Sequence, residues 1–256
     1  MAPNGRLTMR IVYEPRGRAK EYADLACNLY IGCTHGCKYC FAPACMHSTP
    51  AKWKSGVYVR QRALELFERD AADMRKNRDG RAILFSFLSD PYQPLEAEEG
   101  ITRRALEIVR DHGLKSKILT KGREDLVSAD FGLMRSAGTE LGITISFVDD
   151  RTRKQWEPAA APVRERLALL EKAHAAGIRT WVSLEPVIDP AQALAVIRTA
   201  LPYVDFWKVG KLNHMKDLEQ KIDWPRFRSD VLALFADAAK HESTDYYIKH
   251  DLLAAK

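Results

Sequence analysis

GCTHGCKYC, residues 32–40, places three cysteines within eight positions of a chain that has only five. The five cysteines lie close together in the sequence: Cys27, Cys33, Cys37, Cys40 and Cys45. The rest of the chain contains no cysteine with which they could pair, so a disulfide framework is implausible. A C-x3-C-x2-C loop instead favours metal or redox chemistry, because thiolates are ligands of iron–sulfur clusters and of zinc.

The composition is that of a soluble globular protein. The chain has 256 residues, of which 46% are hydrophobic and 29% charged, enough for a sizeable core. Its first residues contain no apolar signal region, and no 18 apolar residues run together, so we expect neither a membrane span nor secretion, and a cytoplasmic location. The formal net charge of +6 permits an anionic substrate or nucleic acid as a partner.

Beyond residue 80, short apolar runs alternate with helical patterns. Strand starts near residues 82, 116, 142, 179 and 204 recur about every 30 residues, which is one strand–helix unit of a mostly parallel sheet. With an earlier strand over 24–31, six core strands result. We therefore predict an α/β fold, a partial (β/α)6 TIM-type barrel, because a closed eight-stranded barrel needs roughly the whole length. Residues 57–61 and 245–253 are additions to a single domain, residues 1–256, whose core barrel covers about 24–240.

Alternation along the predicted strands separates two sets of side chains. In TWVSLE (180–185), Val182 and Leu184 face the outer helices, which leaves Ser183 and Glu185 pointing inward. The same reasoning gives an inward set at the carboxyl ends of the strands, where barrel active sites lie: Ser89, Lys121, Ser146, Ser183, Glu185 and Lys208. The alternative is that these polar residues only mark the places where strands run into loops.

The cysteine loop follows the first predicted strand and so reaches the same end of the barrel. A cubane cluster has four irons, so three cysteines leave one iron without a protein ligand. CTHGCKYC, residues 33–40, resembles the signature of the radical S-adenosylmethionine enzymes. That resemblance implies a [4Fe-4S] cluster on Cys33, Cys37 and Cys40, with the aromatic Tyr39 before the last ligand. It also implies that S-adenosylmethionine binds the open iron and is cleaved to a 5′-deoxyadenosyl radical, which abstracts hydrogen from a substrate.

Most of the chain resembles the spore photoproduct lyase-like branch of that superfamily. The matching stretches are NLYIGCTHGCKYCFAP (28–43), FLSDPYQPLE (87–96), LTKG (119–122), ISFVDD (145–150), Glu157 with Pro158, and EPVID (185–189). The resemblance implies that Ser89 and Lys121 contact the methionyl part of the cofactor and Ser146 its ribose or carboxylate. The backbone near Glu185 would contact the adenine, and Asp90 with Pro91 would shape a turn at the site.

Two departures from that branch concern the hydrogen donor. Phe87 stands where the lyase has its donor cysteine, and Phe41 where it has one tyrosine of a radical relay; Tyr39 corresponds to the other. Phenylalanine can do neither job, so we do not expect the lyase's DNA repair. Tyr39 and Cys45 are the candidate catalytic residues. Cys45 could replace the lost thiol from another loop, or it could be only a small buried residue.

Candidate substrate contacts follow the last core strand. KVGKLNH (208–214) supplies Lys208, Lys211, Asn213 and His214 at the predicted barrel mouth, and Tyr92 is expected to be an exposed aromatic nearby. For Lys208 the alternative is a buried ion pair. A zinc site of Cys37, Cys40, Cys45 and His47 is chemically admissible and would make the chain a zinc-binding nucleic-acid module. A pure electron carrier is disfavoured because carriers generally use four protein ligands for each cluster.

The sequence therefore predicts a radical S-adenosylmethionine enzyme. The first hypothesis for its substrate is a nucleic acid or nucleotide, and the alternative is a peptide or small metabolite, because a fold alone does not select a substrate. The resemblance also implies an external electron donor of the flavodoxin or ferredoxin type.

Overall fold

The computed structural model describes residues 9–85, 87–239 and 244–255. Its main feature is an eight-stranded sheet in the order β1-β2-β5-β6-β7-β8-β9-β10, so β1 and β10 form its two edges. All neighbours from β2 to β10 are parallel, and β1 is antiparallel to β2. The strands are β1 (Val12–Tyr13), β2 (Leu25–Cys27), β5 (Ala82–Phe85), β6 (Lys115–Thr120), β7 (Glu140–Thr144), β8 (Thr180–Val187), β9 (Phe206–Lys211) and β10 (Asp245–Ile248).

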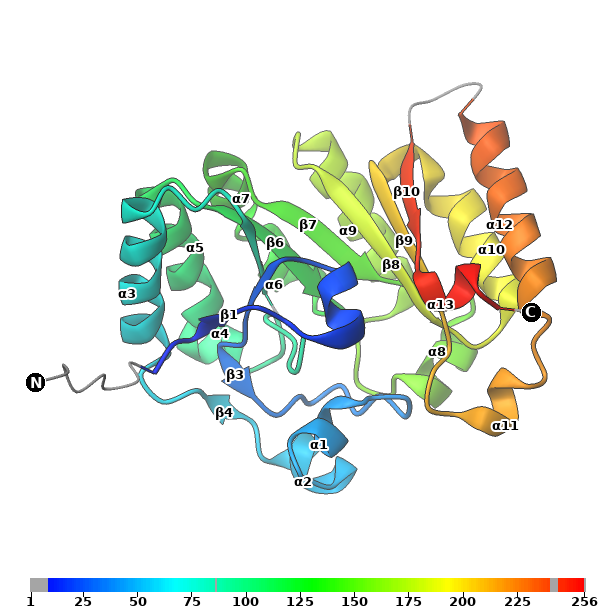
Figure 1. The fold of residues 1–256 in the computed structure, drawn as a ribbon, viewed down its shortest axis with the longest axis horizontal. Coiled ribbons are helices and arrows are strands. Elements are labelled where there is room, and N and C mark those ends of the chain that lie inside the picture. The colour runs from blue at the N-terminus through cyan, green and yellow to red at the C-terminus, as the bar shows by residue number, and fades with distance from the viewer. Residues whose placement is uncertain (1–8, 86, 240–243, 256) are drawn as a thin grey trace, which may run out of the picture.

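Helices cover the outer face of this curved sheet, and a short 3-10 helix lies against its inner face (Figure 1). The outer helices are α3 (Ala63–Lys76), α5 (Ile101–His112), α7 (Phe131–Ala137), α9 (Val163–Ala175), α10 (Pro190–Ala200) and α12 (Trp224–Ala238). The inner helix is η1 (Gly17–Glu21). Among the described residues, none of the helices has both the length and the apolar composition that crossing a membrane would require.

Shorter elements lie in the connections. They are α1 (Ala42–Cys45), α2 (Pro50–Ser55), α4 (Glu96–Glu99), α6 (Glu124–Ser128), α8 (Asp150–Trp156), η2 (Leu201–Tyr203), α11 (Lys216–Glu219) and α13 (His250–Leu253). A separate two-stranded antiparallel sheet consists of β3 (Tyr30–Ile31) and β4 (Tyr58–Val59).

The core lies between the sheet and the outer helices. Phe85 of β5 packs edge-on against Phe67 of α3, with ring centroids 5.4 Å apart. At the other end of the sheet, Trp207 of β9 packs against Phe235 of α12. Because helices cover one face and η1 with its flanking loops covers part of the other, the central strands are buried on both faces, as is usual for parallel sheets.

The predicted partial barrel with six parallel core strands, now β2 and β5 to β9, is confirmed. One strand was expected over 24–31, and this is wrong: β2 and β3 belong to different sheets. The break falls at Asn28, whose side-chain oxygen accepts hydrogen bonds from the backbone N–H groups of Phe87 and Leu88 and so ties this part of the chain to the loop after β5. Of the two predicted additions, residues 58–59 pair with β3, and residues 245–248 extend the main sheet in parallel.

Gly142 on the inner face of β7 makes room for the ring of Trp181. A Cβ at this position would lie 2.1 Å from Cε2 of Trp181, which is buried. We therefore expect Gly142→Ala to lower the free energy of unfolding by about 1–3 kcal/mol, as overpacking does. Gly132→Ala in α7 is the control, because a Cβ there meets no atom within 4 Å, and it should be neutral or stabilising. Equal urea midpoints for the two variants would contradict this.

Candidate functional site

A cavity of about 480 Å³ opens at the carboxyl ends of the parallel strands, on the inner face of the sheet. Every core strand contributes to its lining directly or through the loop that follows it. The contributions include Cys33, Phe87, Lys121, Thr144, Glu185 and Lys211. This is the end of the barrel at which the alternation pattern placed the inward set, and Ser89, Lys121, Ser183 and Glu185 do line the cavity.

The three cysteines of the loop lie together on one wall of this cavity. Burial raises the pKa of each thiol, for Cys33 to about 12 and for Cys37 to about 11. The loop is held from outside by α2, because the Cys33 N–H donates to the Trp53 carbonyl at 3.1 Å. Gly32 is needed at this contact: it has φ +81°, and a Cβ there would lie 2.7 Å from the carbonyl oxygen of Gly56.

The donor set suits a polynuclear cluster better than a single ion. Three thiols with no competing carboxylate ligand among them are typical of iron–sulfur sites. Among the described residues, no three His, Cys, Asp or Glu side chains are grouped as the ligands of one metal ion. The alternative zinc site finds no support in this geometry. Cys45 is exposed at the end of α1 and, like His47, is not part of the cavity lining.

Hydrogen bonds connect the loop after β5 to the cysteine loop. Ser89 Oγ donates to the carbonyl of Tyr30 at 3.0 Å, and the Thr34 N–H donates to Gln93 Oε1 at 3.3 Å. Tyr30, in turn, donates its hydroxyl hydrogen to Glu96. These contacts join FLSDPYQPLE to the segment that carries the cysteines, and they leave Ser89 facing the cavity.

Asp90 hydrogen-bonds to groups of the loops after β5 and β6. Its carboxylate accepts hydrogen bonds from the N–H of Tyr92 (2.9 Å), from the N–H of Lys121 (2.7 Å) and from Thr120 Oγ1 (2.5 Å). His35 Nδ1 lies 3.5 Å from the same carboxylate. Asp90 therefore ties the ends of β5 and β6 to the cysteine loop.

The expectation that Tyr92 is an exposed aromatic is wrong. The side chain is 1% exposed, and its hydroxyl donates to Asp130 at 2.9 Å. The pKa of Tyr92 is raised well above its usual range, first by burial and then by the nearby charge of Asp130. Tyr92 belongs to the hydrophobic core, and its carbonyl oxygen and Cβ lie close to Gly122. It does not line the cavity.

Tyr39 is anchored to a buried ion pair that the sequence analysis did not find. Its hydroxyl donates to Glu157, whose other carboxylate oxygen lies 2.6 Å from the guanidinium of Arg166. Glu157 and Arg166 are almost completely buried. Arg166 also donates to the carbonyls of Thr144 (3.0 Å) and Ala161 (2.8 Å). The ion pair thus connects the cysteine loop to the end of β7 and to α9.

The charges around Glu157 keep it ionised. Burial would raise the pKa of its carboxyl, but the positive charges of Arg166 and Lys121 outweigh that effect and leave the pKa below its usual value. Lys121 is itself close to the ring of Tyr39, with its Nζ 5.7 Å from the ring centroid. Lys121 therefore lines the wall that carries the thiols, and Glu157 and Arg166 lie behind that wall.

The opposite wall is built around Glu185. Lys249 donates to both of its carboxylate oxygens at 2.9 Å, and the Tyr22 hydroxyl donates to it at 2.5 Å. Ser183 Oγ lies 2.8 Å from the same hydroxyl. Lys249 follows β10, and Tyr22 follows η1, so two distant segments meet here. Sequence reasoning missed both residues, because neither belongs to a motif and only the folded topology brings them to Glu185.

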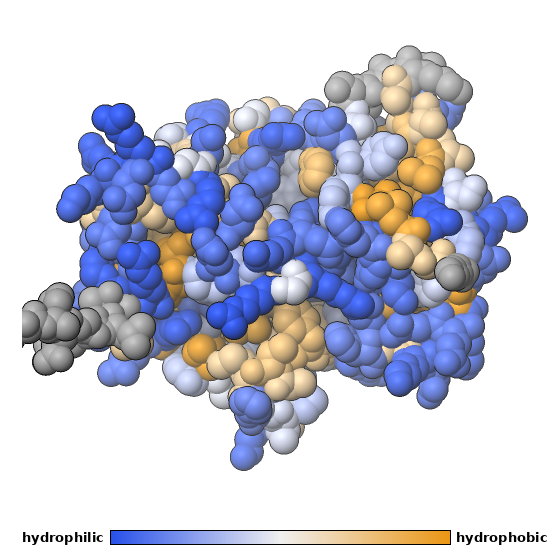
Figure 2. Space-filling model, in the orientation of Figure 1, coloured by the Kyte–Doolittle hydropathy of each residue, from blue (hydrophilic) through white to orange (hydrophobic). Residues whose placement is uncertain are grey.

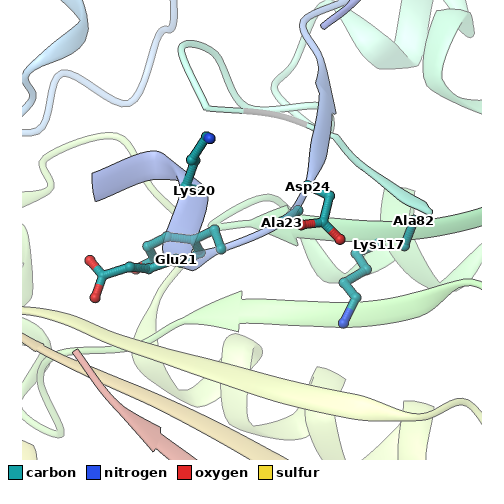
Figure 3. A pocket seen from close by; sticks show the side chains of 7 residues that line it. Lys20, Glu21, Ala23, Asp24, Ala82 and Lys117 are labelled. Carbon is teal, nitrogen blue, oxygen red and sulfur yellow. The ribbon is translucent and has the colours of Figure 1, made fainter. Parts of the chain in front are cut away.

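Tyr22 also separates the cavity from a smaller hollow of about 180 Å³ at the other end of the strands. Figure 3 shows that hollow, with Lys20, Asp24, Ala82 and Lys117 around it. The inner space of the barrel is therefore divided into two hollows that share Tyr22 as a lining residue.

Lys208 was expected after the last core strand, at the mouth, and this is wrong. β9 continues to Lys211, so Lys208 lies within the strand and below Tyr22, with its Nζ 4.6 Å from the ring centroid of Tyr22. It donates to the carbonyl of Glu21, is 6% exposed and does not line the cavity.

The remaining candidates divide between the mouth and the interior. Lys211, Asn213 and His214 line the cavity, as expected of substrate contacts; Asn213 is held by Asp251 at 2.9 Å and Lys211 by Glu219 at 3.2 Å. Ser146 is fully buried behind the lining, and its hydroxyl has no hydrogen-bond partner among the described residues.

The fold and the cysteine wall define a partial-barrel protein with a three-thiol site at its mouth. The model of the Radical SAM superfamily matches residues 27–193, more than half of the chain, so the chain belongs to this superfamily.

Uncharacterised relatives share most of the chain. A protein of Methanocaldococcus jannaschii is 30% identical over 194 residues, which cover 75% of this chain and 71% of that protein. A protein of Acidianus two-tailed virus is 27% identical over 187 residues, which cover 69% of this chain and 60% of that protein.

Solved structures show the likeness of fold. A variant of spore photoproduct lyase superposes with a TM-score of 0.67 at 14% identity, covering 93% of this chain and 79% of that one. SuiB of Streptococcus suis, bound to S-adenosylmethionine, superposes with a TM-score of 0.58 at 12% identity, covering 87% and 49%.

Glu157→Gln should destabilise the protein strongly, because it leaves the guanidinium of Arg166 buried without its counter-charge. We expect the free energy of unfolding to fall by about 3–5 kcal/mol. Glu124→Gln is the matched control: it removes the exposed pair with Lys172, also 2.8 Å or less between charged atoms, and should cost less than about 1 kcal/mol. Urea unfolding of both variants measures this. Similar losses of unfolding free energy would show that the buried pair contributes no more to stability than the exposed pair.

Lys208 should make stability depend on pH. Burial, together with the charges of Lys117 and Lys249, lowers its pKa from 10.5 to about 8. Between those values the unfolded chain binds a proton that the folded chain does not, so the contribution of Lys208 to stability rises with pH from about 8 to 10.5. We expect Lys208→Met to lack this rise, which is up to about 3 kcal/mol. Urea unfolding of both proteins across this range tests it; a wild-type-minus-variant difference that does not change with pH would contradict it.

Proposed function

We propose that this protein is a radical S-adenosylmethionine enzyme that takes a hydrogen atom from a phosphate-bearing substrate, a nucleotide or nucleic acid. In this proposal Cys33, Cys37 and Cys40 hold a [4Fe-4S] cluster. When bound and reduced, the cluster supplies the electron that cleaves S-adenosylmethionine to the 5′-deoxyadenosyl radical. An external electron donor, which enzymes of this superfamily usually need, would in turn reduce the cluster.

The residues next to the thiols are suited to hold the cofactor. Ser89 and Lys121 lie in the cavity lining beside the cysteine wall, and Asp90 fixes the backbone of both loops. Tyr39 is the neighbour of the last cysteine and is oriented by Glu157. The backbone at Glu185 completes the cofactor contacts that we propose, whereas Ser146 lies behind the lining. In the lining, Lys121 offers a hydrogen-bond donor for a carboxylate, and Phe87 and Leu119 shield the site from water.

The observation that carries the substrate class is the charge of the cavity lining. Five lining residues are Lys or Arg, whereas only Asp90 and Glu185 are acidic. Both carboxylates are already committed, Asp90 to backbone N–H groups and Glu185 to Lys249 and Tyr22. The excess cations attract a polyanion to the mouth and are the kind of contact that phosphate groups accept.

Two of these cations lie at the mouth on the η1 side. Arg16 has no ion-pair partner among the described residues, and Arg18 pairs with Asp251 at 3.6 Å but is 53% exposed, against 19% for Lys211 and 3% for Lys249. Lysines 211 and 249 lie across the cavity from the cysteine wall and are paired with carboxylates. Arg16 and Arg18 are therefore the cations most available to a phosphate.

The repair reaction of spore photoproduct lyase is not part of this proposal, although one solved lyase contains a dinucleoside spore photoproduct and AdoMet. The only thiols in the described cavity lining are those of the three loop cysteines, and Phe87 faces Tyr22 with ring centroids 5.8 Å apart. A hydrogen-donating thiol at that position is thus missing. Tyr39 remains our candidate for a radical-relay residue, while the exposed position of Cys45 offers no support for a catalytic role.

The double variant Arg16→Gln/Arg18→Gln tests the substrate class. We expect the affinity for a short single-stranded oligonucleotide, measured by fluorescence anisotropy, to fall at least tenfold. The slope of log K against log salt should decrease by about one for each phosphate group that the variant no longer neutralises. Cleavage of S-adenosylmethionine by the dithionite-reduced enzyme without substrate should not change. Arg226→Gln on α12 is the control, since that side chain is exposed and lies on the outer helix layer.

The reaction itself is tested with deuterated candidates. Label from a nucleotide or oligonucleotide appearing in 5′-deoxyadenosine would support the proposal. Label only from a peptide or a small metabolite without phosphate, with no oligonucleotide binding at low salt, would overturn it in favour of the alternative substrate class. A reconstituted protein that never cleaves S-adenosylmethionine would overturn the radical chemistry.

A further inference from the structure

Phe41 is an exposed aromatic residue in the lining of the cavity. It directly follows the last loop cysteine and is the N-cap residue of α1, where its carbonyl accepts a hydrogen bond from the Cys45 N–H at 3.2 Å. The backbone at Phe41 is therefore held in place, yet the side chain is 46% exposed. Because an apolar ring in water lacks the stabilisation that burial would give it, a ligand that covers Phe41 gains that contribution.

The other Phe and Tyr rings of the lining are held by neighbouring side chains. Tyr22 and Tyr39 each donate a hydrogen bond to a carboxylate, and Phe87 packs edge-on against Tyr22. Within the described part of the chain, Phe41 forms no ring pair and lies under no cation. Of these four rings, Phe41 is thus the one that is available to a ligand.

The chain around Phe41 carries positive charge and no negative charge. No acidic residue occurs between Asp24 and Glu65, whereas the same stretch contains five cations: Lys38, Lys52, Lys54, Arg60 and Arg62. Figure 2 shows hydrophobic side chains on the lower lobe of the molecule, the region of α1 and α2 in Figure 1, beside hydrophilic ones at its tip. Aromatic side chains beside cations are the combination with which proteins bind single-stranded nucleic acid, because every base has a flat face that can stack.

The cations proposed above for phosphate contact line the same cavity as Phe41. They are Arg16 and Arg18, and both side chains are exposed. An apolar side chain of a peptide could also cover Phe41, but a peptide does not carry an anionic group beside every apolar one. A nucleic acid repeats a flat base and a phosphate in each unit, so it matches a cavity that combines a free ring with cations.

Phe41 lies farther out on its wall than the thiols. Its side chain is classed as exposed, whereas the three loop cysteines are only partly exposed. The reacting nucleotide must come close to the thiol end of the cavity, so a base on Phe41 belongs to a neighbouring nucleotide at the rim. Bases in a duplex are paired and stacked, so a nucleotide that enters a cavity has to be unpaired, and stacking on a protein ring offsets part of the lost stacking.

We propose that Phe41 is a stacking platform for the nucleobase next to the reacting nucleotide, and that the substrate is therefore an unpaired stretch of nucleic acid. This rests on the proposed function, from which it takes the phosphate-bearing substrate. The reacting nucleotide enters the cavity, the adjoining phosphate faces Arg16 and Arg18, and the neighbouring base covers Phe41. Phe41 binds and takes part in no bond-making step. A free mononucleotide gains nothing from Phe41, whereas an oligonucleotide does.

Phe41→Ala tests the platform in the reconstituted full chain with two labelled probes. One is a short single-stranded oligonucleotide, and the other is its abasic analogue, which keeps every phosphate and lacks the bases. We expect the affinity for the oligonucleotide, measured by fluorescence anisotropy, to fall about fivefold or more because one stacking contact is lost. The affinity for the abasic analogue should not change, which also shows that the variant is folded. The slope of log K against log salt should stay the same, since no phosphate contact is removed.

Three further variants separate stacking from simple apolar contact. Phe41→Trp keeps a flat ring and should bind the oligonucleotide at least as tightly as the wild type, whereas Phe41→Leu keeps an apolar side chain without a ring and should lose most of the gain. Tyr58→Ala is the matched control. Tyr58 on β4 is an exposed aromatic residue too, at 56%, but it lies outside the cavity lining, so its removal should leave both affinities unchanged.

A single abasic position, moved along the oligonucleotide, identifies the base that stacks. In the wild type one such position should weaken binding more than the others do. In Phe41→Ala that difference should disappear, because the base and the ring then no longer interact and the two changes cease to add.

The abasic probe separates this proposal from the one on which it rests. If the wild type binds the abasic analogue as tightly as the oligonucleotide, or binds a duplex of the same sequence as tightly as the single strand, the platform is overturned while the phosphate-bearing substrate stands. Equal losses for both probes in Phe41→Ala, or a loss for an unstructured peptide alone, overturn it as well. If the wild type binds neither probe at low salt, the failure lies with the proposed substrate class, and the platform falls with it.

Discussion

The buried ion pair between Glu157 and Arg166 is the interaction on which the site depends. A charge in the core is costly to leave alone, so each of these groups requires the other. Because Glu157 also accepts from Tyr39, and Arg166 also donates to Thr144 at the end of β7, the cysteine loop cannot shift relative to the barrel without breaking the pair. Glu157 and Arg166, which do not line the cavity, thus fix the position of the three thiols.

Asp90 acts in the same manner on the other side of the loop. Its carboxylate collects backbone N–H groups from two loops and lies beside His35. Together the two carboxylates hold a segment that has little regular structure of its own, since residues 32–41 contain neither a helix nor a strand. The buried carboxylates of Glu157 and Asp90 hold residues 32–41 in place, as backbone hydrogen bonds between strands would hold a strand.

Much of the fold and one wall of the site could be predicted from the sequence, because they rest on local signals. The strand period and the alternation of TWVSLE located Ser183 and Glu185, and the spacing of the cysteines located the loop. Tyr22 and Lys249 could not be found in this way, since their roles arise from contacts between segments far apart in the chain. Tyr92 and Lys208 were misplaced for a related reason: a loop motif and a strand end do not reveal how far a strand continues or which way a ring turns.

The two walls of the cavity come from different parts of the chain. The cysteine wall belongs to a continuous early segment, whereas the Glu185 wall is completed by Tyr22 after η1 and by Lys249 after β10. Both closing residues lie outside residues 27–193, the part of the chain that matches the superfamily model. The open side of this partial barrel is thus completed by segments that the superfamily match does not include.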